Sequence, residues 1–329
     1  MAFISIGSLG GTIAMVKDEQ HGGVVPKLSA ELLVNAVPDL KQFAHIQAET
    51  LLQLPSPSLK IQHIMDVLHW ADQQILNGAD GIVLTQGTDT LEETAFLLDL
   101  FWKHDKPLIV TGAMRTPNAA GADGPANILS SVITAASPDT IGRGVLVVLN
   151  NTIHVARFIR KSHTLDVATF ISSIGGSLGY VVEDRPIFFS SLKDLPKLDA
   201  QLLKKSVKIG FYECLLDGDV DVLEMMLEQN HYHGIVIAGF GAGHVSQDEM
   251  AIITRYMDKK PIILASRTYS GSTAAKTYGF CGSEIDLAAK GVILAKWLNP
   301  RQARLLLWAL LASGQSIGDI KAFFNAYNP

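Results

Sequence analysis

Short apolar runs rich in β-branched residues alternate with longer amphipathic stretches along most of this chain of 329 residues. Runs that are apolar throughout are typical of parallel strands in a sheet that helices cover on both faces. In the first half we expect strands at residues 3–7, 81–85, 107–112 and 144–149, and helices at 59–76, 91–102 and 125–136. The pattern therefore predicts a doubly wound α/β domain with a mainly parallel sheet.

A second, smaller α/β domain is predicted after a change of composition. From about residue 183 to 206 the pattern weakens, with Pro186, Pro196 and several charges of both signs, which is typical of a connecting segment. Beyond it we expect strands at 207–212, 234–239 and 261–265, and helices at 220–228, 248–257, 301–312 and 317–327. We predict an N-terminal domain at 1–185, a linker at 186–206 and a C-terminal domain at 207–329; the length suits two domains.

Composition excludes several classes of partner. Hydrophobic residues make up 48% of the chain, and 27 basic against 32 acidic residues give a net charge of −5. A folded core is expected, and without an overall positive field nucleic acid is not an expected partner. No apolar run reaches the roughly 20 residues that cross a bilayer, so no membrane segment is expected. The first residues lack a basic region and soon meet glycines, which favours a strand over a signal peptide, and hence the cytoplasm.

Cysteine and histidine placement predicts no metal site. Cys214 and Cys281 are the only cysteines, too few for a four-cysteine zinc site and compatible with a reducing compartment. His231 and His233 share one strand face but have no acidic or cysteine companion at metal-ligand spacing.

Glycines follow the first predicted strand in the run GSLGGTIA, residues 7–14. Glycines let a backbone approach a ligand closely, and Thr12 adds a hydroxyl at the end of the loop. A dinucleotide-binding oxidoreductase would need G-x-G-x-x-G at the start of a helix and an acidic residue about 20 positions later, and the spacing of Gly7, Gly10 and Gly11 does not supply this. A structural glycine turn and a functional loop both remain open from these residues alone.

A second polar run, TQGTDTLEET at residues 85–94, follows the second predicted strand. Thr90 and Glu93 fit a capping box at the start of a helix. Thr88 next to Asp89 is instead a plausible pair for handling protons, because a hydroxyl lies beside a carboxylate at the end of a strand.

Charged residues also follow the third and fourth predicted strands. Asp123 and Pro125 fit a turn and the first turn of a helix, and Arg115 either positions an anionic group or pairs with a neighbouring carboxylate. Lys161 is a surface residue or a base, and a lysine serves as a base only where its amine is neutral.

Several segments taken together resemble the bacterial-type L-asparaginase family in order and spacing. They are GSLGGTIAM, LTQGTDTLEETAFLLDL, TGAMR with AGADGPANI, and GVLVVLNNTI with RKSHTLDVATF. The similarity continues through GIVIAGFGAG and SEIDLAAKGVILAKWLNPRQAR, so it covers nearly the whole chain.

The resemblance implies a cofactor-free hydrolase that releases ammonia from the side-chain amide of a small molecule. It gives Thr12 the role of nucleophile, and gives Thr88, Asp89 and Lys161 those of the second threonine and its partners, with the lysine relaying protons. An acyl-enzyme would form with loss of ammonia and be attacked by water, with backbone N–H groups near Gly11 and Asp89 as oxyanion donors.

The resemblance also implies how substrate is held and how subunits assemble. Ser56 matches a contact to the substrate carboxylate, Asp89 also a contact to its amino group, and Glu284 an acidic residue from the neighbouring subunit. Family members are usually tetramers of close dimers, with sites between one subunit's N-terminal domain and its neighbour's C-terminal domain, so a dimer or tetramer is expected.

The chain departs from the family around the amino end of the ligand. No tyrosine occurs between residues 12 and 38, where the family carries one on a lid. Pro57 stands in place of a glutamine, His244 in place of an asparagine, and Gln86 in place of a histidine. We keep His244 as a substrate-binding residue and expect shifted selectivity, with N-substituted asparagine or a cyclic imide as a competing substrate.

Two different functions also remain open. One is a catalytically retired protein that binds amides without hydrolysing them. The second is an amidotransferase subunit, although the chain shows neither the appended domain nor the basic face that such a subunit would need.

Overall fold

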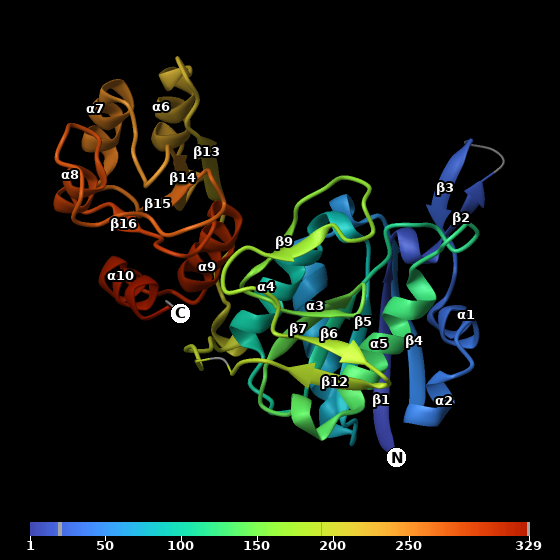
Figure 1. Cartoon of the computed structure of the whole chain (residues 1–329). Helices are drawn as coiled ribbons and strands as arrows, with labels where there is room; N and C mark the ends of the chain where they lie inside the picture. Colours follow the sequence, from blue (N-terminus) through green and yellow to red (C-terminus); the bar gives the residue numbers. More distant parts are fainter. Residues whose placement is uncertain (19–21, 192, 328–329) are drawn as a thin grey trace. The chain divides into compact units, whose positions relative to one another are not determined.

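The computed structural model describes residues 1–18, 22–191 and 193–327, and the chain divides into two compact units, Met1–Leu192 and Lys193–Pro329 (Figure 1). The predicted linker, 186–206, contains this boundary, and its first residues belong to the last strand of the first unit, Arg185–Phe188. Each unit combines helices with a sheet, and the larger sheet is mainly parallel. The predicted α/β class is therefore confirmed.

Within the described residues of the first unit, eight strands form one sheet in the order β12-β11-β8-β7-β6-β5-β1-β4. They are β1 (Ala2–Gly10), β4 (Ala44–Leu54), β5 (Gly81–Thr85), β6 (Leu108–Thr111), β7 (Val145–Leu149), β8 (Thr152–Val155), β11 (Gly179–Val182) and β12 (Arg185–Phe188). The strands from β4 to β7 run parallel, and β8, β11 and β12 are antiparallel. The four predicted strands are present and occupy its centre.

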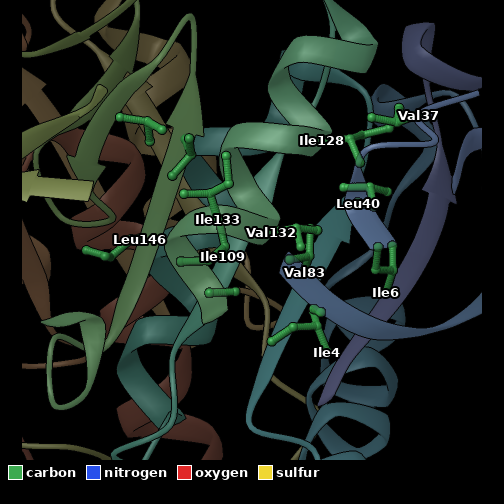
Figure 2. Close-up of a cluster of buried hydrophobic side chains, with 14 of the residues drawn as sticks. Ile4, Ile6, Val37, Leu40, Val83, Ile109, Ile128, Val132, Ile133 and Leu146 are labelled. Atoms are coloured by element: carbon green, nitrogen blue, oxygen red, sulfur yellow. The ribbon is translucent and has the colours of Figure 1, made fainter. Parts of the chain in front are cut away.

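Helices cover both faces of this sheet. They are α1 (Ala30–Asn35), α2 (Leu40–Phe43), α3 (Ile61–Leu76), α4 (Leu91–Phe101) and α5 (Gly124–Ala136). Ile4 and Ile6 of β1 point into a cluster with Ile128 and Val132 of α5 (Figure 2). Residues on the other face approach α3, since a Cβ at Gly7 would lie 3.0 Å from the Trp70 ring. Burial on both faces explains why these strands are apolar throughout.

Short elements absent from the sequence prediction surround the ends of the central strands. Two antiparallel pairs join β2 (Met15–Asp18) to β3 (Gly23–Pro26) and β9 (Ile159–Lys161) to β10 (Phe170–Ser172). Single 3₁₀ turns are η1 (Thr12–Ala14), η2 (Ser56–Ser58), η3 (Thr88–Thr90) and η4 (Pro138–Thr140). Three of these turns follow β1, β4 and β5 directly, at the carboxyl ends where ligands bind parallel sheets.

The second unit contains a parallel sheet in the order β13-β14-β15-β16 within its described residues. Its strands are β13 (Ile209–Glu213), β14 (Gly234–Gly239), β15 (Ile262–Ser266) and β16 (Ile293–Leu294). Its helices are η5 (Ala200–Leu202), α6 (Val220–Glu228), α7 (Gln247–Tyr256), α8 (Glu284–Ala289), α9 (Pro300–Ala312) and α10 (Ile317–Ala326). Leu223 and Leu227 of α6 and Ile253 of α7 pack on Ile235 and Ile237 of β14. Every strand and helix predicted here is present.

Cys214 is buried, Cys281 is exposed, and both are free thiols. In residues 1–18, 22–191 and 193–327, no helix combines the length and apolarity of a membrane span.

Candidate active site

The glycine loop after β1 presses against the loop after β5. Gly11 adopts a φ of 80°, and a Cβ placed there would lie 2.0 Å from the backbone nitrogen of Gly87. No side chain fits at such an approach, which explains the glycine. Thr12 follows Gly11 and is half-buried, and Thr88 follows Gly87. The two threonines therefore extend from backbones that touch.

Thr88, Asp89 and Lys161 form a hydrogen-bonded group. The Lys161 Nζ donates to Thr88 Oγ1 at 2.9 Å and pairs with Asp89 Oδ1 at 2.7 Å. The Lys161 side chain is 16% exposed, whereas that of Asp89 is 60% exposed. The three residues that the resemblance groups together are thus in direct contact, and their joint role in proton transfer stays a prediction.

Glu92 fixes the backbone that carries Lys161. Lys161 is the last residue of β9, and its backbone N–H donates to Glu92 Oε2 at 2.6 Å. Glu92 lies in the first turn of α4 and is 5% exposed, so the bond joins α4 to β9, which lie close together in Figure 1. Sequence reasoning missed this role, although Glu92 belongs to the acid-rich run that follows β5.

Ser56 supports the second threonine loop from the end of β4. Its Oγ accepts a hydrogen bond from the Asp89 N–H at 3.2 Å, and its carbonyl accepts one from the Thr90 hydroxyl at 3.2 Å. The predicted capping box of Thr90 and Glu93 is therefore wrong, because the Thr90 hydroxyl caps no helical N–H. Ser56 is 3% exposed. Its contact with a substrate carboxylate remains a prediction.

Two of the N–H groups considered as oxyanion donors have partners within the protein. The Gly11 N–H donates to the Leu54 carbonyl at 3.1 Å, and the Asp89 N–H donates to Ser56 Oγ. These bonds hold the two loops in place. Neither of these two N–H groups is therefore free to donate to an oxyanion.

The loop after β6 is held by Asp123. Its carboxylate accepts hydrogen bonds from the N–H groups of Met114 and Arg115, each at 2.9 Å. The Arg115 Nη1 donates to the Gly121 carbonyl at 2.9 Å, so this side chain closes its own loop. Pro125 lies in the first turn of α5, which confirms the predicted helix start.

His244 and Glu284 meet in the second unit. His244 follows β14 and Glu284 begins α8; His244 Nε2 lies 3.4 Å from Glu284 Oε2. Glu284 is fully buried, and its Oε1 accepts hydrogen bonds from the N–H groups of Thr277 and Tyr278 at 2.8 and 2.9 Å. The His244 ring lies edge-on to those of Tyr278 and Phe280.

The surroundings of Glu284 favour its charged form. Burial alone would raise the pKa of Glu284, but hydrogen bonds from the backbone of Tyr278 and Thr277, together with the charge of His244, outweigh it. The net effect lowers the pKa below its usual value of 4.5. The carboxylate is thus a preorganised anion.

No group of three or more His, Cys, Asp or Glu side chains within the described ranges is arranged to hold a metal ion. The group around Lys161 in the first unit and the pair His244 and Glu284 in the second supply hydroxyl, amine, carboxylate and imidazole groups. Because the two groups lie in separate units, it stays a prediction that they form one active site.

Comparisons with known proteins place these observations in a family. The model of the asparaginase N-terminal domain matches residues 3–193, and that of the glutaminase/asparaginase C-terminal domain matches residues 208–324. The L-asparaginase of Bacillus licheniformis is 34% identical over 311 residues, covering 94% of this chain and 95% of that protein. L-asparaginase 2 of Escherichia coli strain K12 is 34% identical over 342 residues, covering 98% and 93%.

A solved structure extends the similarity to the fold. The crystal structure of a probable cytoplasmic L-asparaginase from Campylobacter jejuni aligns with a TM-score of 0.89 and 30% identity, covering 99% of this chain and all of that one. The resemblance read from the sequence motifs is confirmed. The chain belongs to the asparaginase family of amidohydrolases, which act on amide C–N bonds.

Proposed function

We propose that this protein hydrolyses L-asparagine to L-aspartate and ammonia, with the Thr12 hydroxyl as nucleophile. The observation that carries the proposal is the bonding of Lys161 Nζ to both Thr88 and Asp89, beside the contact of Gly11 with Gly87. The relatives named above as L-asparaginases support asparagine as the substrate.

The chemistry requires an activated nucleophile, since a threonine hydroxyl is weak and an amide carbonyl is a poor electrophile. As the Thr12 oxygen attacks the amide carbon, its proton passes through the Thr88 hydroxyl to Lys161, whose amine must be neutral when it accepts the proton. N–H groups of the two loops stabilise the oxyanion, and the C–N bond breaks as the leaving nitrogen takes a proton and departs as ammonia. Water then attacks the acyl-enzyme, regenerating Thr12 and releasing aspartate.

Substrate recognition divides between the two units in this proposal. Ser56 and Gly11 border the carboxylate end, and the exposed Asp89 uses one carboxylate oxygen for Lys161 and offers the other to the substrate's ammonium. His244 and Glu284 of a neighbouring subunit complete the amino end. Glu284 suits that role because its charge is preorganised.

We also propose that the substrate selectivity of this protein differs from that of its relatives, because the residues expected around the amino end of the ligand are altered. Pro57 lacks the amide that a glutamine would offer, and His244 presents an imidazole packed edge-on against two aromatic rings. These changes favour testing N-substituted asparagine and small cyclic imides as competing substrates.

Coupled detection of ammonia tests the proposal directly. The panel is L-asparagine, L-glutamine, their D-forms, an N-substituted asparagine and a cyclic imide, the last followed by ring opening because it releases no ammonia. We expect amide hydrolysis by the natural protein and a loss of at least about a hundredfold in kcat/KM in Thr12→Ala and Lys161→Met. Lys41→Met, an exposed change on α2, is the matched control. Full activity in Thr12→Ala, or no hydrolysis of any panel member by the natural protein, contradicts the proposal.

Assembly as a dimer or tetramer and a cytoplasmic location belong to the same proposal. The Campylobacter relative is named cytoplasmic, and two free thiols suit a reducing compartment. Light scattering of the purified protein tests the assembly, with a monomer as the contrary result. Cell fractionation tests the location, with recovery outside the cytoplasm as the contrary result.

A further inference from the structure

A cavity of about 490 Å³ opens in the second unit at the amino ends of its parallel strands. Lys205 precedes β13, His233 precedes β14, and Lys259 and Lys260 precede β15; all four line the cavity. His244 follows β14, so it lies at the carboxyl ends of the same strands. Because substrates of parallel sheets bind at the carboxyl ends of strands, a ligand in this cavity is distinct from the amide substrate.

The charge of the cavity is mainly positive. Glu228 is the one acid among its described lining residues, and it accepts a hydrogen bond from the Tyr256 hydroxyl at 2.9 Å. Lys259 Nζ lies over the Tyr256 ring, 4.5 Å from its centre. Within the described part of the chain, Lys205, Lys259 and Lys260 form no ion pair with a carboxylate. The three lysines thus border the cavity, and the single negative charge of Glu228 does not balance their positive charge.

Lys260 is the buried member of this group. It is 8% exposed, and its Nζ donates to the Gln229 carbonyl at 2.9 Å. Burial first, and then the charge of Lys259, lower the pKa of Lys260. A carbonyl supplies a dipole and no counter-charge, so the buried ammonium remains uncompensated. An anion in the cavity would supply that charge.

We propose that this cavity binds a small molecule with a dianionic phosphate or dicarboxylate, held by Lys205, Lys259 and Lys260. Lysine ammonium groups bind the oxygens of both anions as point charges. The volume exceeds that of a bare phosphate, and Asn230, with Gln315 from the turn after α9, offers amide groups to the rest of the ligand.

Isothermal titration of the full chain in phosphate-free, low-salt buffer tests the proposal. Inorganic phosphate and succinate are titrated separately as the two dianions, with chloride at matched ionic strength as the control for screening. We expect saturable binding of at least one dianion at one site per chain, weakened tenfold or more in both Lys205→Ala and Lys259→Ala. A tenfold loss corresponds to about 1.4 kcal/mol.

Lys204→Ala is the matched control, because Lys204 is exposed, adjacent in sequence and not among the lining residues. It should leave affinity within about twofold of the natural protein. Binding of phosphate alone, or of succinate alone, supports the site and identifies the anion. The proposal is overturned if neither dianion binds up to about 10 mM, or if Lys204→Ala weakens binding as much as the cavity variants. Both cavity lysines chosen are exposed, so these variants should fold, and binding is measured without turnover, independently of the amidase proposal.

Discussion

Gly11 shows how one residue without a side chain sets the distance between the two loops that carry Thr12 and Thr88. The run GSLGGT predicts a close backbone approach, because glycine permits it. The run does not reveal that Gly11 contacts Gly87, which lies 76 positions later in the sequence. Parallel pairing of β1 with β5 brings the two glycines together. The sequence alone thus predicted a close backbone approach at these glycines, but its partner could not be predicted because it depends on how the strands pair in the sheet.

Replacing Gly11 by alanine should destabilise the first unit by about 3 kcal/mol or more, since the added Cβ meets backbone atoms that cannot rotate away. Gly142→Ala is the control, because Gly142 also has a positive φ, 75°, but nothing lies within 4 Å of an added Cβ. It should cost about 1 kcal/mol. Urea unfolding measures both, and equal losses would show that the loop contact adds nothing to backbone strain.

The buried parallel strands at the centre of the first unit's sheet were predictable, and its half-exposed edge strand β4 was not. The central strands are apolar on both faces, whereas β4 at the sheet edge alternates buried or half-buried with exposed positions. The pairs β2–β3 and β9–β10 have strands of only three or four residues. These missed elements bear on the proposed site, because β4 leads to Ser56 and β9 carries Lys161.

β8 is joined to β10, the partner of β9, by a buried histidine. His154 Nδ1 lies 2.9 Å from Ser172 Oγ, and burial lowers the pKa of His154 to about 4 from 6.5. Below pH 6.5 the unfolded chain binds a proton at His154, whereas the folded chain binds it only near pH 4. The contribution of His154 to the unfolding free energy is therefore complete above pH 6.5 and is lost as pH falls toward 4. We expect a loss of about 2 kcal/mol in unfolding free energy between about pH 7 and pH 5.

His154→Asn removes this titration and keeps a hydrogen-bonding group near Ser172. Between pH 7 and pH 5 the variant should therefore lose about 2 kcal/mol less unfolding free energy than the natural protein loses. Denaturant unfolding at each pH measures the difference, in which other titrating groups cancel. An identical pH dependence in both proteins would contradict the assignment.

The residues proposed for the active site lie in two units, and a separate family model matches each unit. Thr12, Thr88 and Lys161 lie in the first unit, and His244 and Glu284 lie in the second. The α/β class of both units and the family were predictable, because buried strands and motif spacing are local features of sequence. Assembly was predicted only through the resemblance to the family, because it depends on surfaces between chains that strand and helix periodicity does not encode.

If Glu284 serves the active site of a neighbouring subunit, two inactive variants should restore activity to each other. Thr12→Ala and Glu284→Gln affect different chains of one shared site, so a mixed dimer contains one intact site and one doubly altered site. Co-expressed variants should recover about a quarter of natural activity by random pairing, while each alone stays inactive. Ammonia release from the co-purified mixture measures this, with two co-expressed Thr12→Ala chains as the control. Activity no higher than that of the separate variants would place Glu284 outside a shared site.

The most direct test of the central claim, that Thr12 and Lys161 act on one amide carbon, is a double-mutant comparison of kcat/KM for L-asparagine. Thr12→Ala, Lys161→Met and the double variant are assayed beside the natural protein, with unfolding checked in each. Residues that act as one unit are not additive, so the double variant should be no slower than the slower single variant within about threefold. Losses that multiply would mean that the two residues work independently and would contradict the account.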